Sequence, residues 1–479
     1  MTKDNGLEAR DTLARFPPGI TPQPADYMLR ISSDSVRKAA TAWLMLALAS
    51  LVGAGIFSIL LVLARTPVIQ EMTPFIDFFR VALVVHVDLS VLIWLLSIAG
   101  LMWSLSSKGD LPGWDRLSFL LAAAGTAIVI ISPFVGAAEP LMNNYVPLLR
   151  HPMYYTGLGL FMAGITSHLL RSLLTLRGIK GGLDGTAALQ FGITLAALTT
   201  VAAIAAFIAS WAGIPGGMDG QAYFEFLFWG GGHVLQFTNT LLMMVAWVVL
   251  AHASGCRFEL TPRLTLIFLI ILALPVITVP FLYVAHDIVS PGHRLAFTEL
   301  MKFGGLSCLP LGLAVFVSLL KAGKPGEAHG DEGKYLRSAL VSSLGLFTVG
   351  GVLGFMISGL DIVIPAHYHG STVGVTIAFM GLAYYLLPRL GFGEPPPRMA
   401  RWQPYLYGGG QLLHIIGLAW SGGYGVQRKT AGLAQGVDRL GEIAGMGLMG
   451  LGGLVSVIGG LLFLIVCYKS IRRRNAPSV

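Results

Sequence analysis

Apolar runs of about 20 residues or more recur along this chain from about residue 38 to about residue 470. A helix of that length crosses the hydrocarbon core of a bilayer, and only 12% of the 479 residues are charged. The pattern therefore predicts an all-α membrane protein, a bundle of twelve transmembrane helices without a soluble domain. The predicted spans are 38–64, 78–105, 117–138, 152–174, 187–212, 223–251, 262–286, 296–320, 336–360, 366–388, 403–423 and 441–470.

Basic residues predict the orientation of this bundle. About 24 of the 32 Lys and Arg residues lie on the side that both termini share, and short cytoplasmic loops carry such an excess. We therefore expect a multi-pass protein of the bacterial inner membrane with both termini in the cytoplasm. Its parts are an N-terminal tail (1–37), one transmembrane catalytic domain (38–472) and a C-terminal tail (473–479).

The excess of basic residues on one side of the membrane explains the net charge of +8. This charge therefore predicts contact with membrane lipid and no nucleic-acid partner. The three cysteines lack CxxC spacing, and we expect neither a disulfide framework nor a thiolate metal site. The chemistry is therefore sought among the eleven histidines.

Two histidines open the tenth predicted span in the segment Ala366-His-Tyr-His. Residues two positions apart on a helix point about 200° away from each other, so His367 and His369 face opposite sides and can serve two metal centres. An imidazole inside a bilayer is costly unless it is paired or ligating, so we expect a functional site. Residues of three other spans reach the same outer depth: His86, His233, His286 and Asp287.

The remaining histidines carry no such prediction. We expect His414 to be a hydrogen-bonded interior residue. Three others fall at or near cytoplasmic ends of spans and two fall in outer loops. The first three are His168, His252 and His329, and the outer-loop pair is His151 and His293.

The span count, the spans that carry histidines and the His-x-His motif together resemble the catalytic subunit of the haem-copper oxidase and nitric oxide reductase superfamily. The likeness covers essentially the whole chain. It implies two b-type haems, a low-spin haem held by His86 and His369 and a high-spin haem held by His367. It also implies a second metal bound by His233, His286 and Asp287. The loop pair Arg428-Lys429 is similar to the basic pair that meets haem propionates.

Two departures from the family pattern bear on the reaction. Asp287 stands where most relatives have a second histidine, and two histidines with a carboxylate are typical of non-haem iron, with copper as the alternative. Phe237 and Pro280 stand where oxygen reductases carry a redox-active tyrosine, while Tyr283 is expected to be ordinary packing. Phe237 also replaces the glutamate of better-known nitric oxide reductases. The chain therefore resembles a divergent nitric-oxide-reductase-like branch.

Protons and electrons must reach such a site. Ala314 replaces the lysine of one family proton route, and Glu225, Glu299 and Asp361 are the outer carboxylates through which protons could enter. The chain has no CxxCH haem-attachment motif and no soluble electron-transfer domain. An electron-donating partner subunit is therefore expected, linked to a cytochrome, a cupredoxin or a quinol.

Three functions remain open from the sequence. The leading interpretation is reduction of NO at a high-spin haem and a non-haem iron. A terminal oxygen reductase with copper in the same ligand set is the first alternative. A transporter or channel is the second, because transporters often have twelve spans, although no clear repeat relates the two halves.

Overall fold

The computed structural model describes residues 26–66, 78–178, 182–256, 260–323, 329–357, 362–426 and 439–473. Within these ranges the chain forms twelve long helical segments, and eleven of them have the length and hydropathy of a membrane span. The exception is α14 (Pro397–Gly422), which matches the predicted eleventh span and includes Gln403. Gln403 is fully buried and accepts a hydrogen bond from Tyr384 at 3.0 Å, so its polar atoms face protein rather than lipid. The prediction of a twelve-helix membrane bundle is confirmed.

Most predicted spans agree with the helices to within a few residues. The second, seventh and eighth spans are each interrupted by a short segment of another helical type (η), so two α labels belong to one span there, and the third span ends in such a segment. The elements are α1 (Asp34–Arg65), α2 (Phe79–Val87), η3 (Asp88–Ile93), α3 (Trp94–Ser106), α4 (Pro112–Ile131), η4 (Ser132–Val135), β1 (Pro140–Leu141), β2 (Leu148–Leu149), α5 (Pro152–Leu174), α6 (Gly185–Gly213), α7 (Gly220–Ala253), α8 (Pro262–Ala273), η5 (Leu274–Thr278), α9 (Val279–Ala285), α10 (Pro291–Gly304), η6 (Gly305–Cys308), α11 (Leu309–Lys321), α12 (Gly330–Phe355), α13 (Val363–Arg389), α14 and α15 (Leu440–Arg472).

The breaks in the seventh and eighth spans lie against each other. Pro275 opens η5, because proline supplies no backbone N–H for the helical ladder. A Cβ on Gly304, where α10 ends, would lie 2.9 Å from the Pro275 side chain. Glycine therefore allows the two interrupted spans to approach closely.

The second, sixth and tenth spans, which carry predicted ligands, are the most enclosed. In its most apolar stretch, α7 has 89% of its residues buried, α13 has 83%, and the span formed by α2, η3 and α3 has 72%. The seventh and eighth spans, at 28% and 17%, are peripheral. The fold therefore places His86, His233, His367 and His369 on its three innermost spans.

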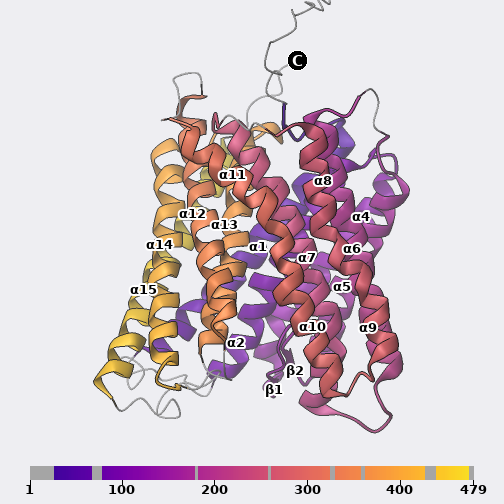
Figure 1. The fold of residues 1–479 in the computed structure, drawn as a ribbon, viewed down its shortest axis with the longest axis vertical. Helices are drawn as coiled ribbons and strands as arrows, with labels where there is room; N and C mark the ends of the chain where they lie inside the picture. The colour runs from indigo at the N-terminus through magenta and orange to yellow at the C-terminus, as the bar shows by residue number, and fades with distance from the viewer. Residues whose placement is uncertain are drawn as a thin grey trace, which may run out of the picture.

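One end of the bundle collects the elements of interest, and we call it the hairpin end (Figure 1). The antiparallel hairpin of β1 and β2 pairs Pro140 with Leu149 and Leu141 with Leu148 there. At the same end α9 runs into α10 (Figure 1). This is the end that the sequence predicts to lie outside the cell.

Helices α12 and α13 touch through glycine. A Cβ on Gly350 would clash with the backbone nitrogen of Ser371, and a Cβ on Gly370 would clash with Gly350 Cα. No side chain fits between two backbones that lie so close together. This contact brings the start of α13, with His367 and His369, against α12.

We predict that Gly350→Ala lowers the thermal unfolding midpoint of the detergent-purified protein, because the added methyl group forces α12 and α13 apart at a cost of about 1–3 kcal/mol. Gly351→Ala is the matched control, since a Cβ at Gly351 meets nothing within 4 Å. The control should keep the wild-type midpoint. Equal midpoints for Gly350→Ala and Gly351→Ala would contradict the close contact.

Candidate haem and metal site

Three predicted ligands share one hydrogen-bonding pattern. The Nδ1 atom of His86 donates to the Ala54 carbonyl at 2.9 Å, that of His233 to Trp229 at 2.7 Å, and that of His367 to Gly350 at 2.7 Å. In each ring the bond fixes the proton on Nδ1 and leaves Nε2 with its lone pair and no hydrogen bond to the described residues. Metal-ligating histidines show this arrangement, so these side chains fit the implied haem and metal ligation.

A second group gathers around His369. Its Nδ1 points to Gln411 Oε1 of α14 at 3.4 Å, and its ring centroid lies 4.9 Å from that of His414. His86, His414 and Arg65 all lie within electrostatic range of His369. The structure therefore brings His86 and His369, the two predicted low-spin haem ligands, into one neighbourhood.

Arg65 is a residue that the sequence analysis missed. It lies in the last turn of α1, and its Nε and one terminal guanidinium nitrogen are buried without a hydrogen-bond partner among the described residues. A buried guanidinium with two unpaired nitrogens beside His369 suits a carboxylate such as a haem propionate. The predicted propionate contacts Arg428 and Lys429 lie outside the described residues, as does the outer carboxylate Asp361.

His367 lies on the other side of α13, against α12. A Cβ on Gly354 would lie 2.8 Å from the His367 ring, so the ring occupies space that glycine leaves free. Gly350, one turn earlier on α12, accepts the Nδ1 hydrogen bond. The ring is thus held by two glycine positions of a neighbouring helix, away from His369 as the sequence predicts.

His233 follows three glycines on α7, and each one makes room for an aromatic side chain. A Cβ on Gly230 would clash with the Tyr283 hydroxyl, one on Gly231 with the Phe207 ring, and one on Gly232 with the Tyr145 ring. Tyr145 and Trp229 place their ring centroids 4.7 Å from that of His233. The Gly-Gly-Gly segment costs helix propensity but permits an aromatic enclosure around this imidazole.

The end of α9 supplies the other predicted ligands of the second metal. His286 is the half-buried C-cap of α9, and Asp287 follows it as an exposed residue. His293, predicted as an outer-loop residue, instead lies in the first turn of α10 and is 0% exposed. That prediction was wrong because the connection between α9 and α10 is short and turns His293 inward.

No three side chains of the His, Cys, Asp or Glu type converge closely enough to hold a metal ion within the described parts of the chain. His233, His293 and His286 nevertheless form a series, each within electrostatic range of the next. Both ring nitrogens of His293 are buried without a partner, and an unsatisfied buried polar group costs about 1–3 kcal/mol. The ligand set His233, His286 and Asp287 therefore stays a prediction.

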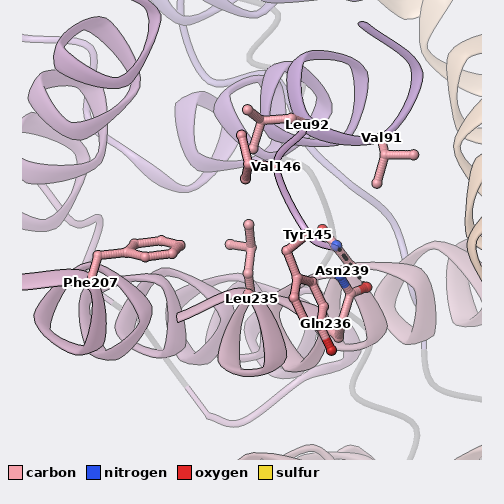
Figure 2. Close-up of a pocket in the computed structure, with 9 residues that line it drawn as sticks. Val91, Leu92, Tyr145, Val146, Phe207, Leu235, Gln236 and Asn239 are labelled. Atoms are coloured by element: carbon pink, nitrogen blue, oxygen red, sulfur yellow. Dashed lines mark hydrogen bonds between the residues drawn. The ribbon is translucent and has the colours of Figure 1, made fainter. Parts of the chain in front are cut away.

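A small cavity of about 20 Å³ lies beside His233, with Tyr145, Gln236 and Asn239 among its lining residues (Figure 2). Asn239 donates to Gln236 Oε1 at 3.3 Å, while its own side-chain oxygen is buried without a partner. This volume suits about one water molecule. A second cavity, of about 410 Å³, adjoins it through Leu92, Phe207 and other shared residues and is lined almost wholly by apolar side chains.

A π-helical turn, η3, begins two residues after His86. Its first residue, Asp88, is fully buried and accepts a hydrogen bond from the Tyr154 hydroxyl at 2.5 Å, with its other oxygen unpaired. The sequence analysis did not anticipate the π-turn. Such turns are frequent at functional sites because the extra residue shifts the helical register.

The structure also shows the surroundings of three further residues named in the sequence analysis, Tyr283, His414 and His168. The hydroxyl of Tyr283 donates to the Ala206 carbonyl and contacts Ser210 Oγ, each at 2.8 Å, so Tyr283 links α9 to α6. His414 donates to the Met449 carbonyl at 2.9 Å, as expected of a hydrogen-bonded interior residue. His168, expected at an interface, is fully buried beside Asp115, because it faces the neighbouring helix rather than the membrane surface.

Comparison with known proteins places this geometry in a family. The family described as cytochrome c and quinol oxidase polypeptide I matches residues 38–462. An uncharacterized protein of Rickettsia prowazekii is 30% identical over 90% of this chain and 95% of its own length. Cytochrome c oxidase subunit 1 of Thermus thermophilus is 24% identical over 85% of this chain and 79% of its own. A solved heme-copper terminal oxidase dimer has the same fold, with a TM-score of 0.70 at 17% identity over 94% of this chain and 85% of the other.

The chain therefore belongs to the cytochrome c and quinol oxidase polypeptide I family, within the haem-copper oxidase superfamily of oxidoreductases. It is a multi-pass integral membrane protein. Members of the superfamily typically bind haems and a further metal, receive electrons from a donor and act on a small substrate.

We predict that replacing His86 or His369 with alanine removes the low-spin haem from the optical spectrum of the purified protein, because each substitution removes one of the two predicted axial ligands. His414→Ala is the matched control, since this imidazole lies beside His369 but is not among the predicted haem ligands. It should keep the low-spin signal. Loss of that signal in His414→Ala but not in His369→Ala would contradict the assignment.

Proposed function

We propose that this protein is a membrane-bound nitric oxide reductase, in which two NO molecules, two electrons and two protons give nitrous oxide and water. The observation that carries the proposal is the absence of tyrosine at positions 237 and 280, where phenylalanine and proline stand. Oxygen reductases of this family place a redox-active tyrosine at one of these positions. Without it, a two-electron reaction is easier to support than four-electron cleavage of dioxygen.

The proposed ligands are those that the resemblance implies. His86 and His369 would hold a low-spin haem, His367 a high-spin haem, and His233 and His286 with Asp287 a non-haem iron. When bound, these groups supply the electrons and the metal positions for the reaction. The chain itself orients the rings, since the carbonyls of Ala54, Gly350 and Trp229 each fix one imidazole.

The larger cavity supports a gaseous substrate. Its lining comes from the second, fourth, fifth and sixth spans, and it has almost no polar surface. An uncharged diatomic gas is favoured in such a space, whereas water finds few hydrogen-bond partners. Because this cavity meets the small one beside His233, it offers NO an apolar approach to the proposed iron.

Proton delivery is proposed to begin at Glu225, near the hairpin end of α7. Its carboxylate accepts hydrogen bonds from the backbone nitrogen of Asn144 at 2.9 Å and from the Asn144 side chain. Tyr145 follows Asn144 and packs on His233. Burial and the nearby Glu225 charge raise the pKa of Tyr145, so its hydroxyl keeps its proton at physiological pH. With both termini in the cytoplasm, as the sequence predicts, the hairpin end lies outside the cell. The proposed proton route therefore opens to the outside.

An oxygen reductase with copper is the second candidate. The relative from Thermus thermophilus is named cytochrome c oxidase subunit 1. Tyr145 also favours it, because this phenol lies against His233 although it comes from the hairpin rather than from the sixth or seventh span. Electrons reach either enzyme from a partner subunit carrying a cytochrome, a cupredoxin or a quinol site.

The two candidates differ in metal content and product. We expect the purified protein to contain two haems and about one non-haem iron per chain, and to release nitrous oxide when supplied with NO and a chemical reductant. Elemental analysis and gas chromatography measure these quantities. One copper per chain, no non-haem iron and rapid reduction of O2 to water would instead establish the oxygen reductase.

For the proton route, we predict that Glu225→Gln slows steady-state turnover by about 100-fold or more, because the amide cannot bind and release a proton. Glu139→Gln serves as the matched control at the same end of the bundle, where Glu139 is exposed and pairs with Arg150. Turnover of the control should equal that of the wild type. If Glu225→Gln turns over as fast as Glu139→Gln, protons enter elsewhere.

A further inference from the structure

Asp88 is a fully buried acidic residue two positions after His86, and the proposed function gives it no role. One of its oxygens accepts a hydrogen bond from the hydroxyl of Tyr154 at 2.5 Å, and the other is buried without a partner among the described residues. Tyr154 is also 0% exposed and lies in the first turn of α5. Inside a membrane few groups can replace a lost hydrogen bond, so this contact ties the second span to the fourth.

Asp88 opens the π-turn η3, and this turn divides the second span into two halves. A π-turn holds one residue more than an α-helical turn, and each residue of a helix advances by about 100°. The turn therefore rotates α2, which carries His86, by about that angle relative to α3. Every residue of α3 is buried, so its packing in the bundle fixes α3. The geometry of η3 consequently decides which way His86 faces.

Contacts with two other helices hold η3 in place. On the α1 side, Leu89 packs where Gly53 has no side chain, since a Cβ there would lie 2.9 Å from a Leu89 methyl carbon. The next residue of α1, Ala54, accepts the Nδ1 hydrogen bond of His86. Within the turn, the Ser90 hydroxyl donates to the His86 carbonyl at 2.6 Å. Toward α5, the turn is held by the buried hydrogen bond to its first residue.

We propose that Asp88 and Tyr154 are positioning residues that fix the π-turn, and with it the direction in which His86 presents Nε2 to a low-spin haem. The inference rests on the proposed role of His86 as an axial ligand, and it holds for either candidate reaction. Residues outside the ligand set orient a ligating imidazole, and that orientation tunes the metal. The Ala54 carbonyl fixes the tautomer of His86, while the turn fixes the backbone from which the ring projects.

Substitutions separate the hydrogen bond from the bulk of the two side chains. Tyr154→Phe removes only the hydroxyl, whereas Asp88→Asn keeps an oxygen that accepts from it. Because Tyr154→Phe leaves Asp88 unpaired and can impair folding, a double variant, Asp88→Leu with Tyr154→Phe, replaces both partners by apolar groups. Tyr384→Phe is the matched control, since Tyr384 is also fully buried and donates to a side-chain oxygen, that of Gln403 on α14.

The readout is the midpoint potential of the low-spin haem, measured by redox titration of each full-length protein purified with its haems. Ferric iron depends more than ferrous iron on electron donation from an aligned imidazole, so a misdirected His86 favours the reduced form. We expect Tyr154→Phe and the double variant to shift the reduction equilibrium toward ferrous haem by about tenfold, which is a rise of about 59 mV for a one-electron couple. Asp88→Asn and Tyr384→Phe should keep the wild-type potential.

Wild-type potentials in both Tyr154→Phe and the double variant would overturn the positioning role, as would an equal shift in Tyr384→Phe. A wild-type protein without a low-spin haem would overturn both this role and the haem assignment of His86. Turnover of O2 but not of NO, together with the expected shifts, would contradict the proposed function alone, because the low-spin haem serves either reaction.

Discussion

The hydrogen bond from an imidazole Nδ1 to a backbone carbonyl is the interaction on which the site depends. Inside a membrane a histidine must satisfy two nitrogens in surroundings that offer few partners. His86 uses a carbonyl of α1, His367 one of α12, and His233 one of its own helix. In each case one nitrogen is occupied and the other remains free to bind a metal. The backbone carbonyls therefore fix the orientation of these three imidazoles.

Glycine makes room for two of these imidazoles and for their neighbours. Gly350 lets α12 approach α13 closely enough for its carbonyl to reach His367, and Gly354 leaves space for the ring. On α7 the segment from Gly230 to Gly232 admits three aromatic side chains around His233. Glycine lowers helix propensity by roughly 1 kcal/mol per residue, so its concentration before a ligand indicates a packing requirement. These five glycines are part of how the predicted ligands are positioned.

Much of the fold and part of the site could be predicted from the sequence. Span lengths follow from bilayer thickness, and the opposite directions of His367 and His369 follow from helical geometry. His86 lies within electrostatic range of His369, while their role as haem ligands stays a prediction. Residues brought in by packing were missed, namely Arg65 beside His369, Tyr145 against His233, and His293 in the first turn of α10. No periodic pattern marks these three, because each lies at a helix end or in a connection.

The sequence by itself determined the number of spans and the two-sided placement of the His-x-His pair. These properties depend on local hydropathy and on the 3.6-residue helical turn, which act over a few residues. Only the tertiary structure decided which histidines share a cluster and which of their nitrogens stay unpaired. The clustering and the unpaired nitrogens both depend on contacts between helices that are distant in the chain. At these contacts a glycine, a π-turn or a short connection places a side chain in the interior rather than at the membrane surface.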